Sequence, residues 1–146
     1  MITFVAVLVG ILYANIVEYL VHKHLFHGLG KKASSIFAFH LRGHHLVSRR
    51  DGFVDMRISK NEFFGMPIAV LFHSPLLFLS PVFFWTITSY AVLFIAIHNM
   101  LHKKPRLAKK YFWWHWNHHM GNQNKSWGVV LPITDLLMGT LEKNKQ

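Results

Sequence analysis

Histidine is the residue type best suited to chemistry in this chain, and most of its copies stand in clusters. The sequence has 12 histidines, 6 carboxylate residues and no cysteine. Thiolate metal sites, disulfides and cysteine nucleophiles are therefore excluded. Four clusters cover residues 22–27, 40–45, 98–102 and 115–119. Because imidazole is a common protein ligand of transition metals, these clusters indicate a metal centre.

Three of the clusters have the spacing of a single helix face. Residues three and four positions apart are neighbours on an α-helix, so their side chains can point to a common centre. The sets with this relation are His98 with His102, His40 with His44 and the adjoining His45, and His115 with His118 and His119. Each of the three clusters is therefore predicted to aim at least two imidazoles at one point.

The first cluster is spaced more loosely. His22 and His27 are five positions apart, whereas His24 and His27 are three apart, so spacing alone leaves the partner of His27 open. One metal ion takes about four to six ligands. The ten or eleven imidazoles of the four clusters therefore indicate two ions.

The charged residues are distributed as a bilayer requires. The chain is 52% hydrophobic and 15% charged, and residues 63–102 carry no charged side chain at all. A helix of about 20 apolar residues crosses a membrane. Residues 2–21 therefore predict one span, and residues 63–101 predict two spans in a hairpin that breaks around Ser80 to Pro81. The predicted fold is an all-α integral membrane bundle of about three spans, with a cytosolic, histidine-rich helical cap.

The basic residues indicate the orientation of this bundle. All Lys and Arg residues lie in residues 23–60 or 103–145, and the net charge is +10. Basic segments favour the cytoplasmic side, and three spans place both segments and all four clusters on that side. Nucleic-acid binding is disfavoured because the spans interrupt the basic segments. The mixed apolar and polar segment 127–146 is expected to dock on the bundle or lie at the interface, without crossing the membrane.

The histidine series resembles the fatty acid hydroxylase and sterol desaturase superfamily, which includes the carotenoid hydroxylases. The resemblance rests on His-x4-His, His-x3-His-His, His-x3-His and His-x2-His-His, followed by "GVVLPITDLLMGT". It covers nearly the whole chain, which is expected to form a single domain over 1–146. By this resemblance the ten metal ligands are His22, His27, His40, His44, His45, His98, His102, His115, His118 and His119.

The resemblance also implies a reaction. Members are membrane-bound, non-haem di-iron oxygenases, so the chain is expected to hold two metal ions, iron in the cell and zinc as a possible substitute in purified protein. With O2 as co-substrate it would hydroxylate or desaturate a lipid such as a fatty acyl, sterol or carotenoid chain. The competing hypotheses are a non-catalytic membrane metal-binding protein and a membrane zinc hydrolase. The hydrolase is disfavoured because the sequence has no His-Glu-x-x-His motif.

Electrons for such a reaction are expected to come from an external donor. Nothing in the 146 residues resembles a haem, flavin or iron–sulfur module. A cytochrome or ferredoxin with an acidic surface would be attracted to a basic face. The predicted docking cluster is Lys103, Lys104, Arg106, Lys109 and Lys110.

Further residues are predicted to support the ligands. Glu18 precedes His22 by one helical turn and is expected to orient a ligand imidazole through its second nitrogen. His24 is interpreted as a residue that supports the ligand rings or is exposed, although its spacing from His27 keeps it eligible as a ligand. Asp135 is a further supporting candidate, whereas His73 is interpreted as a buried histidine bonded to a neighbouring helix. Four phenylalanines are interpreted as packing or lipid-facing residues, with an acyl path as the alternative: Phe26, Phe64, Phe72 and Phe94.

Overall fold

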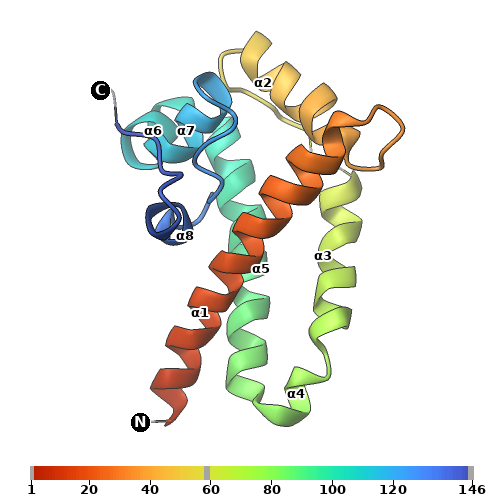
Figure 1. The fold of residues 1–146 in the computed structure, drawn as a ribbon, viewed down its shortest axis with the longest axis vertical. Helices are drawn as coiled ribbons and strands as arrows, with labels where there is room; N and C mark the ends of the chain where they lie inside the picture. Colours follow the sequence, from red (N-terminus) through yellow and green to blue (C-terminus); the bar gives the residue numbers. More distant parts are fainter. Residues whose placement is uncertain (1, 58–59, 145–146) are drawn as a thin grey trace.

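The computed structural model describes residues 2–57 and 60–144, and within these ranges every regular element is a helix. Two long helices form the body of the molecule (Figure 1). The first, α1 (Ile2–Leu20), continues directly into a π-helix, η1 (Val21–Gly28). The second is α5 (Pro81–Lys103), which packs along α1. The predicted all-α fold is confirmed for the described residues.

Short helices cover one end of this pair. After η2 (Leu29–Lys31) come the π-helix η3 (His40–His45) and α2 (Leu46–Arg50). Beyond α5, the chain forms α6 (Pro105–Tyr111), α7 (Trp113–Met120) and α8 (Ile133–Leu137). In Figure 1, α2, α6 and α7 lie at the end opposite the N-terminus and α4 (Leu76–Leu79). Every histidine cluster therefore lies at the same end of the molecule, as predicted.

The predicted hairpin differs from expectation in its first arm. Helix α3 (Lys60–His73) has 14 residues, so it is about 21 Å long at ~1.5 Å per residue, short of the roughly 30 Å of a hydrocarbon core. The chain bends at Ser74 and Pro75, forms the short α4, and turns again at Ser80. There the side chain of Ser80 caps α5 by accepting a bond from the Phe83 N–H, and Pro81 occupies the first helical turn.

The structure thus contains two helices that are long and apolar enough to cross a membrane, within the residues described. These are the continuous helical stretch Thr3–Lys31 and α5. The predicted second span, the first arm of the hairpin, is instead a shorter apolar helix, Phe63–His73. Its break comes earlier than expected because Pro75 follows Ser74 directly, and a residue before proline is disfavoured in helical conformation.

Apolar side chains of the long helices point outward. Phe4 of α1 is 67% exposed and Trp85 of α5 is 58% exposed, and many smaller apolar side chains on the two helices are exposed as well. The helices contact each other through small residues: a Cβ at Gly10 would lie 2.9 Å from the Thr86 methyl carbon, and Ala14 is buried. An exposed apolar girdle of this kind suits a lipid environment.

Hydrogen bonds tie the remaining segments to α1. The predicted role of His73 as a link to a neighbouring helix is confirmed, because its Nε2 lies 2.9 Å from the hydroxyl of Tyr13, although the side chain is only half buried. On the other side, Asn15 donates to the carbonyl of Leu131 at 2.7 Å and accepts from the backbone and hydroxyl of Thr134. The C-terminal segment is therefore docked on the bundle, as expected.

Candidate metal centre

Two π-helices bring together histidines that an α-helix would separate. At about 100° per residue, side chains five apart on an α-helix differ by about 140° in direction. In a π-helix the hydrogen bonds run from residue i to i+5, which returns residues five apart to a common side. His22 and His27 lie on η1, and His40 and His45 lie on η3. The looser spacing of the first cluster is thereby explained.

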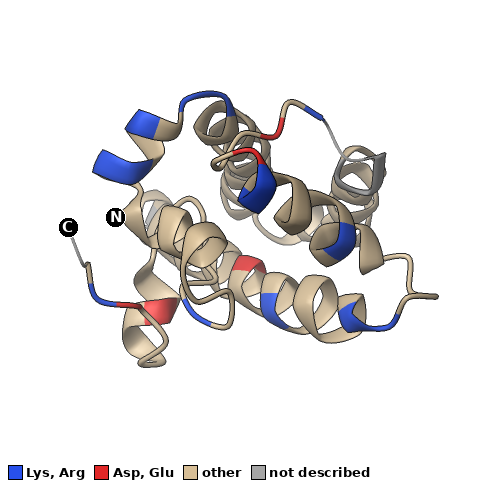
Figure 2. Cartoon of the chain, turned by 90° about the horizontal axis from the view of Figure 1, so that it is seen from above, with Lys and Arg blue, Asp and Glu red and all other residues tan. Residues whose placement is uncertain are grey.

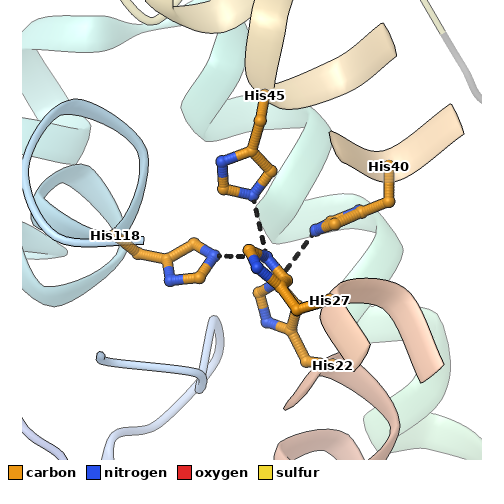
Figure 3. Close-up of side chains that lie close together, drawn as sticks. All are labelled: His22, His27, His40, His45 and His118. Atoms are coloured by element: carbon orange, nitrogen blue, oxygen red, sulfur yellow. Dashed lines mark hydrogen bonds between the residues drawn. The ribbon is translucent and has the colours of Figure 1, made fainter. Parts of the chain in front are cut away.

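The first histidine group consists of five buried side chains from three elements. Their ring nitrogens lie within 4.8 Å of one another, and they belong to His22, His27, His40, His45 and His118. Figure 3 shows the five rings directed toward a common centre from η1, η3 and α7. The Nε2 atoms of His22 and His40 are 3.0 Å apart, and Nε2 of His27 is 3.1 Å from those of both His45 and His118.

The second histidine group lies beside the first. Ring nitrogens of four buried residues again lie within 4.8 Å of one another: His44, His98, His102 and His119. His115, also buried, joins this side, because its Nε2 is 3.2 Å from Nε2 of His102. The rings of His45 and His119 stack at 4.1 Å and form a shared wall between the groups. All ten predicted ligands are therefore brought together, five on each side.

Adjacent histidines divide between the two groups. His44 belongs to the second group and His45 to the first, and the same division separates His119 from His118. Neighbouring residues on a helix point about 100° apart, so each paired histidine can serve a different centre. Helices η3 and α7 thus bridge the groups, which explains why the sequence carries paired histidines in these two elements.

The spacing of the nitrogens fits metal ions. Two nitrogens bound at about 2.0–2.1 Å, with about 90–109° between them, are roughly 2.9–3.4 Å apart, and an opposed pair is about 4.2 Å apart. The observed Nε2 separations of 3.0–3.2 Å match adjacent ligands, and the limit of 4.8 Å within each group is somewhat wider than an opposed pair. Each group has the dimensions of a coordination shell built from imidazole.

The hydrogen bonds of the outer nitrogens show which nitrogen of each ring is available to a metal. The Nδ1 atoms of His22, His102 and His118 lie 2.5, 2.7 and 2.8 Å from the carbonyl oxygens of Trp127, Phe53 and Lys125, respectively. A carbonyl oxygen only accepts, so these Nδ1 atoms carry the proton. In a neutral ring Nε2 then carries the lone pair, and this lone pair points inward toward other Nε2 atoms.

Burial keeps five of the rings neutral. It lowers the pKa of His40, His45, His115, His118 and His119 well below the ordinary value of 6.5, and the charges of neighbouring histidines lower it further. Neutral imidazole is the ligand form, so protons do not compete for these nitrogens near pH 7. Nε2 of His44 and of His119 are buried without a hydrogen-bond partner among the described residues, as expected of ligand atoms.

The structure gives Glu18 a different role from the predicted one. Its carboxylate accepts bonds from the backbone of Val129 and Val130 and from the hydroxyl of Tyr90. The second nitrogen of His22 binds Trp127 instead. Glu18 therefore acts on the C-terminal segment rather than on a ligand ring.

The other two predicted supporting residues, His24 and Asp135, lie in different environments. His24 is exposed on η1, because its position on this π-helix is on a different side from His22 and His27. No hydrogen bond joins it to a ligand ring among the described residues, so the exposed alternative fits and a supporting role for His24 stays a prediction. Asp135 is fully buried and accepts from the backbone of Trp127 and Gly128 and from Thr140. It therefore reaches the first group indirectly, through Trp127.

Sequence reasoning missed two partners of the second group, both in the loop after α2. Asp55 accepts a bond from Nδ1 of His44 at 3.1 Å, and the Phe53 carbonyl accepts from His102. Phe53 is fully buried with φ 81°, which is unusual for a bulky residue, and it follows Gly52 at φ 66°. The only sequence signal was an Asp-Gly pair that marks a turn.

Aromatic side chains line both groups. Phe26 stacks on His40 at 5.0 Å and Phe94 stacks on His98 at 5.6 Å. Phe64 and Phe72, the other two phenylalanines singled out from the sequence, are 61% and 79% exposed, as lipid-facing residues would be. The space around the histidines is therefore partly apolar.

Cations surround this end of the molecule. Figure 2 shows Lys and Arg at the periphery of the end that carries the histidines, with few acidic residues among them. The predicted docking cluster is exposed throughout: Lys103, Lys104, Arg106, Lys109 and Lys110. The cations lie outside the two histidine groups, whose members are all buried.

Comparison with known proteins identifies the family. A family model described as fatty acid hydroxylase matches residues 7–140. The chain belongs to the fatty acid hydroxylase family. The match contains both histidine groups, and the resemblance inferred from the histidine series is confirmed. Members of this family are membrane-associated, metal-dependent oxidoreductases that use oxygen. No curated protein and no solved structure matches the chain.

Proposed function

We propose that this fatty acid hydroxylase family member is a membrane di-iron oxygenase that hydroxylates or desaturates an aliphatic carbon of a lipid. The observation that carries the proposal is the convergence of ten buried imidazoles, in two groups of five, at one end of two apolar helices. His22, His27, His40, His45 and His118 would hold one ion. His44, His98, His102, His115 and His119 would hold the other.

The donor set supports a redox metal within this family. Imidazole nitrogen suits iron, zinc and manganese, and the family's oxygen chemistry selects iron. When bound, two iron ions supply the activation of O2 for attack on an unactivated C–H bond. The chain itself contributes ring orientation through the outer hydrogen bonds and a buried site from which bulk water is excluded.

The surroundings of the site support a lipid substrate, such as a fatty acyl, sterol or carotenoid chain. Phe26 and Phe94 place apolar rings directly against one candidate ligand of each group. The outward faces of α1 and α5 are apolar, so a lipid in the bilayer can approach the centre without crossing a polar surface. A substrate hydrocarbon would contact these side chains rather than the basic rim.

The basic surface of α6 supports an external electron donor, a cytochrome or ferredoxin with acidic side chains at its docking face. Lys109 lies 5.9 Å from the ring of Trp116, Trp116 lies 4.8 Å from Phe53, and Phe53 stacks on His102 at 4.3 Å. Surface and second group are thus linked by packed aromatic rings. Because basic segments favour the cytoplasm, we propose that this end of the molecule faces the cytoplasm.

Single substitutions of the paired histidines test the proposal. His118→Ala should remove the metal of the first group and His119→Ala that of the second, and the double variant should remove both. The detergent-purified protein is analysed for iron and zinc, and the lipids of cells that express each variant are profiled. His24→Ala is the matched control, because this side chain is exposed on η1.

The outcomes distinguish the competing functions. Two ions in the wild type and a new hydroxylated or desaturated lipid that disappears in both single variants support the oxygenase. Two ions with no change in any lipid would favour a non-catalytic metal-binding protein. Full metal retention in the double variant would overturn the proposed site.

A further inference from the structure

The second histidine group has an anionic partner. Nδ1 of His44 donates to Oδ2 of Asp55 at 3.1 Å, and both residues are buried, with 8% and 5% of their surfaces exposed. A carboxylate only accepts, so the proton of His44 is held on Nδ1. The lone pair of His44 is then on Nε2, the atom that is buried without a hydrogen-bond partner in the described part of the chain.

Arg57 holds Asp55 in this position. Its Nε donates to Oδ1 of Asp55 at 3.0 Å, and its backbone N–H donates to the same oxygen at 3.1 Å. A terminal nitrogen of Arg57 also donates to the carbonyl of Gly43, the residue directly before His44. The carboxylate therefore has a fixed orientation, and its charge is balanced by a cation that is itself anchored to η3.

The acceptors that bind the outer ring nitrogens differ in charge between the two groups. In the first group, the outer nitrogens of His22 and His118 bind neutral backbone carbonyls. In the second group, His102 binds the carbonyl of Phe53, but His44 binds a carboxylate. A carboxylate behind an imidazole fixes the ring and makes it a stronger donor to a metal, and removal of such partners typically lowers metal affinity about 10–100-fold.

We infer that Asp55 is a positioning residue that sets the metal affinity of the second histidine group through His44, and leaves the first group unaffected. The inference rests on the proposed metal centre. By this inference the two groups differ in what sets their metal affinity. The affinity of the second group depends on a carboxylate outside the histidine motifs.

Metal titration of the protein in detergent tests this role. Metal is removed with a chelator, and Co²⁺ is added while its visible absorption reports each bound equivalent. Asp55→Asn keeps an oxygen that can accept from His44 but removes the charge, and Asp55→Ala removes both. One equivalent should lose about 10-fold or more in affinity in Asp55→Asn and more in Asp55→Ala, whereas the other equivalent stays unchanged.

The chain offers a matched control in the same loop. Asp51 is an exposed carboxylate that pairs with the exposed Arg50, so Asp51→Asn should bind both equivalents as the wild type does. The first group serves as an internal control for folding, because a variant that binds one equivalent normally is folded around it. His118→Ala in the Asp55→Asn background should then abolish tight binding of both equivalents.

The possible failures are distinguishable. If the wild type binds two equivalents and Asp55→Asn binds both with unchanged affinity, the role of Asp55 is overturned and the metal centre stands. If both equivalents weaken equally in Asp55→Asn, the selective role is likewise overturned. If the wild type binds no metal, the proposed function fails, and the inference about Asp55 fails with it.

Discussion

The Nδ1–H of His22 donates to the backbone carbonyl of Trp127 at 2.5 Å, although 105 positions separate the two residues. This bond joins the end of the first long helix to the C-terminal segment. Trp127 is held in turn by Asp135, which accepts its N–H at 2.9 Å and that of Gly128 at 2.7 Å. A carboxylate near the end of the chain thus orients a candidate ligand near its beginning.

Asp135→Asn is therefore expected to weaken metal binding in the first group. An asparagine has a single acceptor oxygen, so one of the two backbone N–H groups would face an amide nitrogen instead. Loss of such a charged hydrogen bond costs about 1.5–3 kcal/mol, part of which should appear as a lower unfolding temperature. The measurement is Co²⁺ titration with thermal unfolding followed by circular dichroism, and Asp51→Asn is the control. An unchanged first equivalent in Asp135→Asn would contradict this chain of contacts.

Gly128 is predicted to tolerate no side chain. A Cβ at this position would press on the backbone oxygen of Leu131 and lie 3.3 Å from Oδ2 of Asp135. The Leu131 oxygen cannot move freely, because it accepts a bond from Asn15 at 2.7 Å. Gly128→Ala should destabilise the protein by about 1–3 kcal/mol, as measured by thermal unfolding.

The matched control for Gly128 is Gly65 in α3, where nothing lies within 4 Å of an added Cβ. Gly65→Ala should be neutral or stabilise the protein by roughly 0.5–1 kcal/mol, because alanine favours the helix. Equal effects of the two alanines would mean that the C-terminal segment is not held as tightly as its contacts indicate.

Charge reversal on α6 should slow electron transfer from an acidic donor. Lys109→Glu combined with Lys110→Glu places two negative charges at the predicted docking surface, and like charges reduce the rate of association. The iron-loaded protein is mixed with a reduced acidic ferredoxin, and the loss of ferric absorption is followed at several salt concentrations. The rate should fall several-fold at low salt, and its dependence on salt should become flatter.

The control reverses charge elsewhere on the same end of the molecule. Lys31 and Lys32 are exposed at the end of η2 and in the following turn, apart from α6 in the chain. Lys31→Glu with Lys32→Glu should leave the rate nearly unchanged. If both pairs slow the reaction equally, donor docking depends on total charge rather than on the α6 surface.

The histidine spacing and the charge distribution were sufficient to predict the all-α fold and the gathering of the four clusters. The mixed apolar and polar pattern of residues 127–146 predicted a docked or interfacial segment. These patterns did not predict the π-helices, because that conformation is rare and the propensities of η1 and η3 residues do not distinguish it from an α-helix. The extent of the first arm of the hairpin was wrong because its helix ends before Pro75 and does not continue to Ser80.

The partners of the ligand rings were less predictable for another physical reason. Trp127, Phe53 and Lys125 contribute backbone carbonyls, which every residue type possesses, so their identities carry no signal. Asp55 and Asp51 look alike in sequence, yet one is buried against His44 and the other is exposed. Only the turn at Gly52 and Phe53 decides which carboxylate reaches the centre.

The metal-free protein is expected to lose stability as the pH falls below about 6.5. Burial holds the pKa of His40, His45, His115, His118 and His119 well below that ordinary value. Below pH 6.5 the unfolded chain therefore binds more protons than the folded one. The free energy of unfolding then decreases as the pH falls. The unfolding temperature, measured by circular dichroism on chelator-treated protein, should fall as the pH is lowered from 7.5 to 5.5.

His24→Ala should show the same slope, because His24 is exposed. His118→Ala with His119→Ala should show a shallower slope, because two buried rings that resist protonation are gone. A midpoint that stays constant or rises on acidification would contradict the burial of neutral imidazoles on which the proposed centre depends.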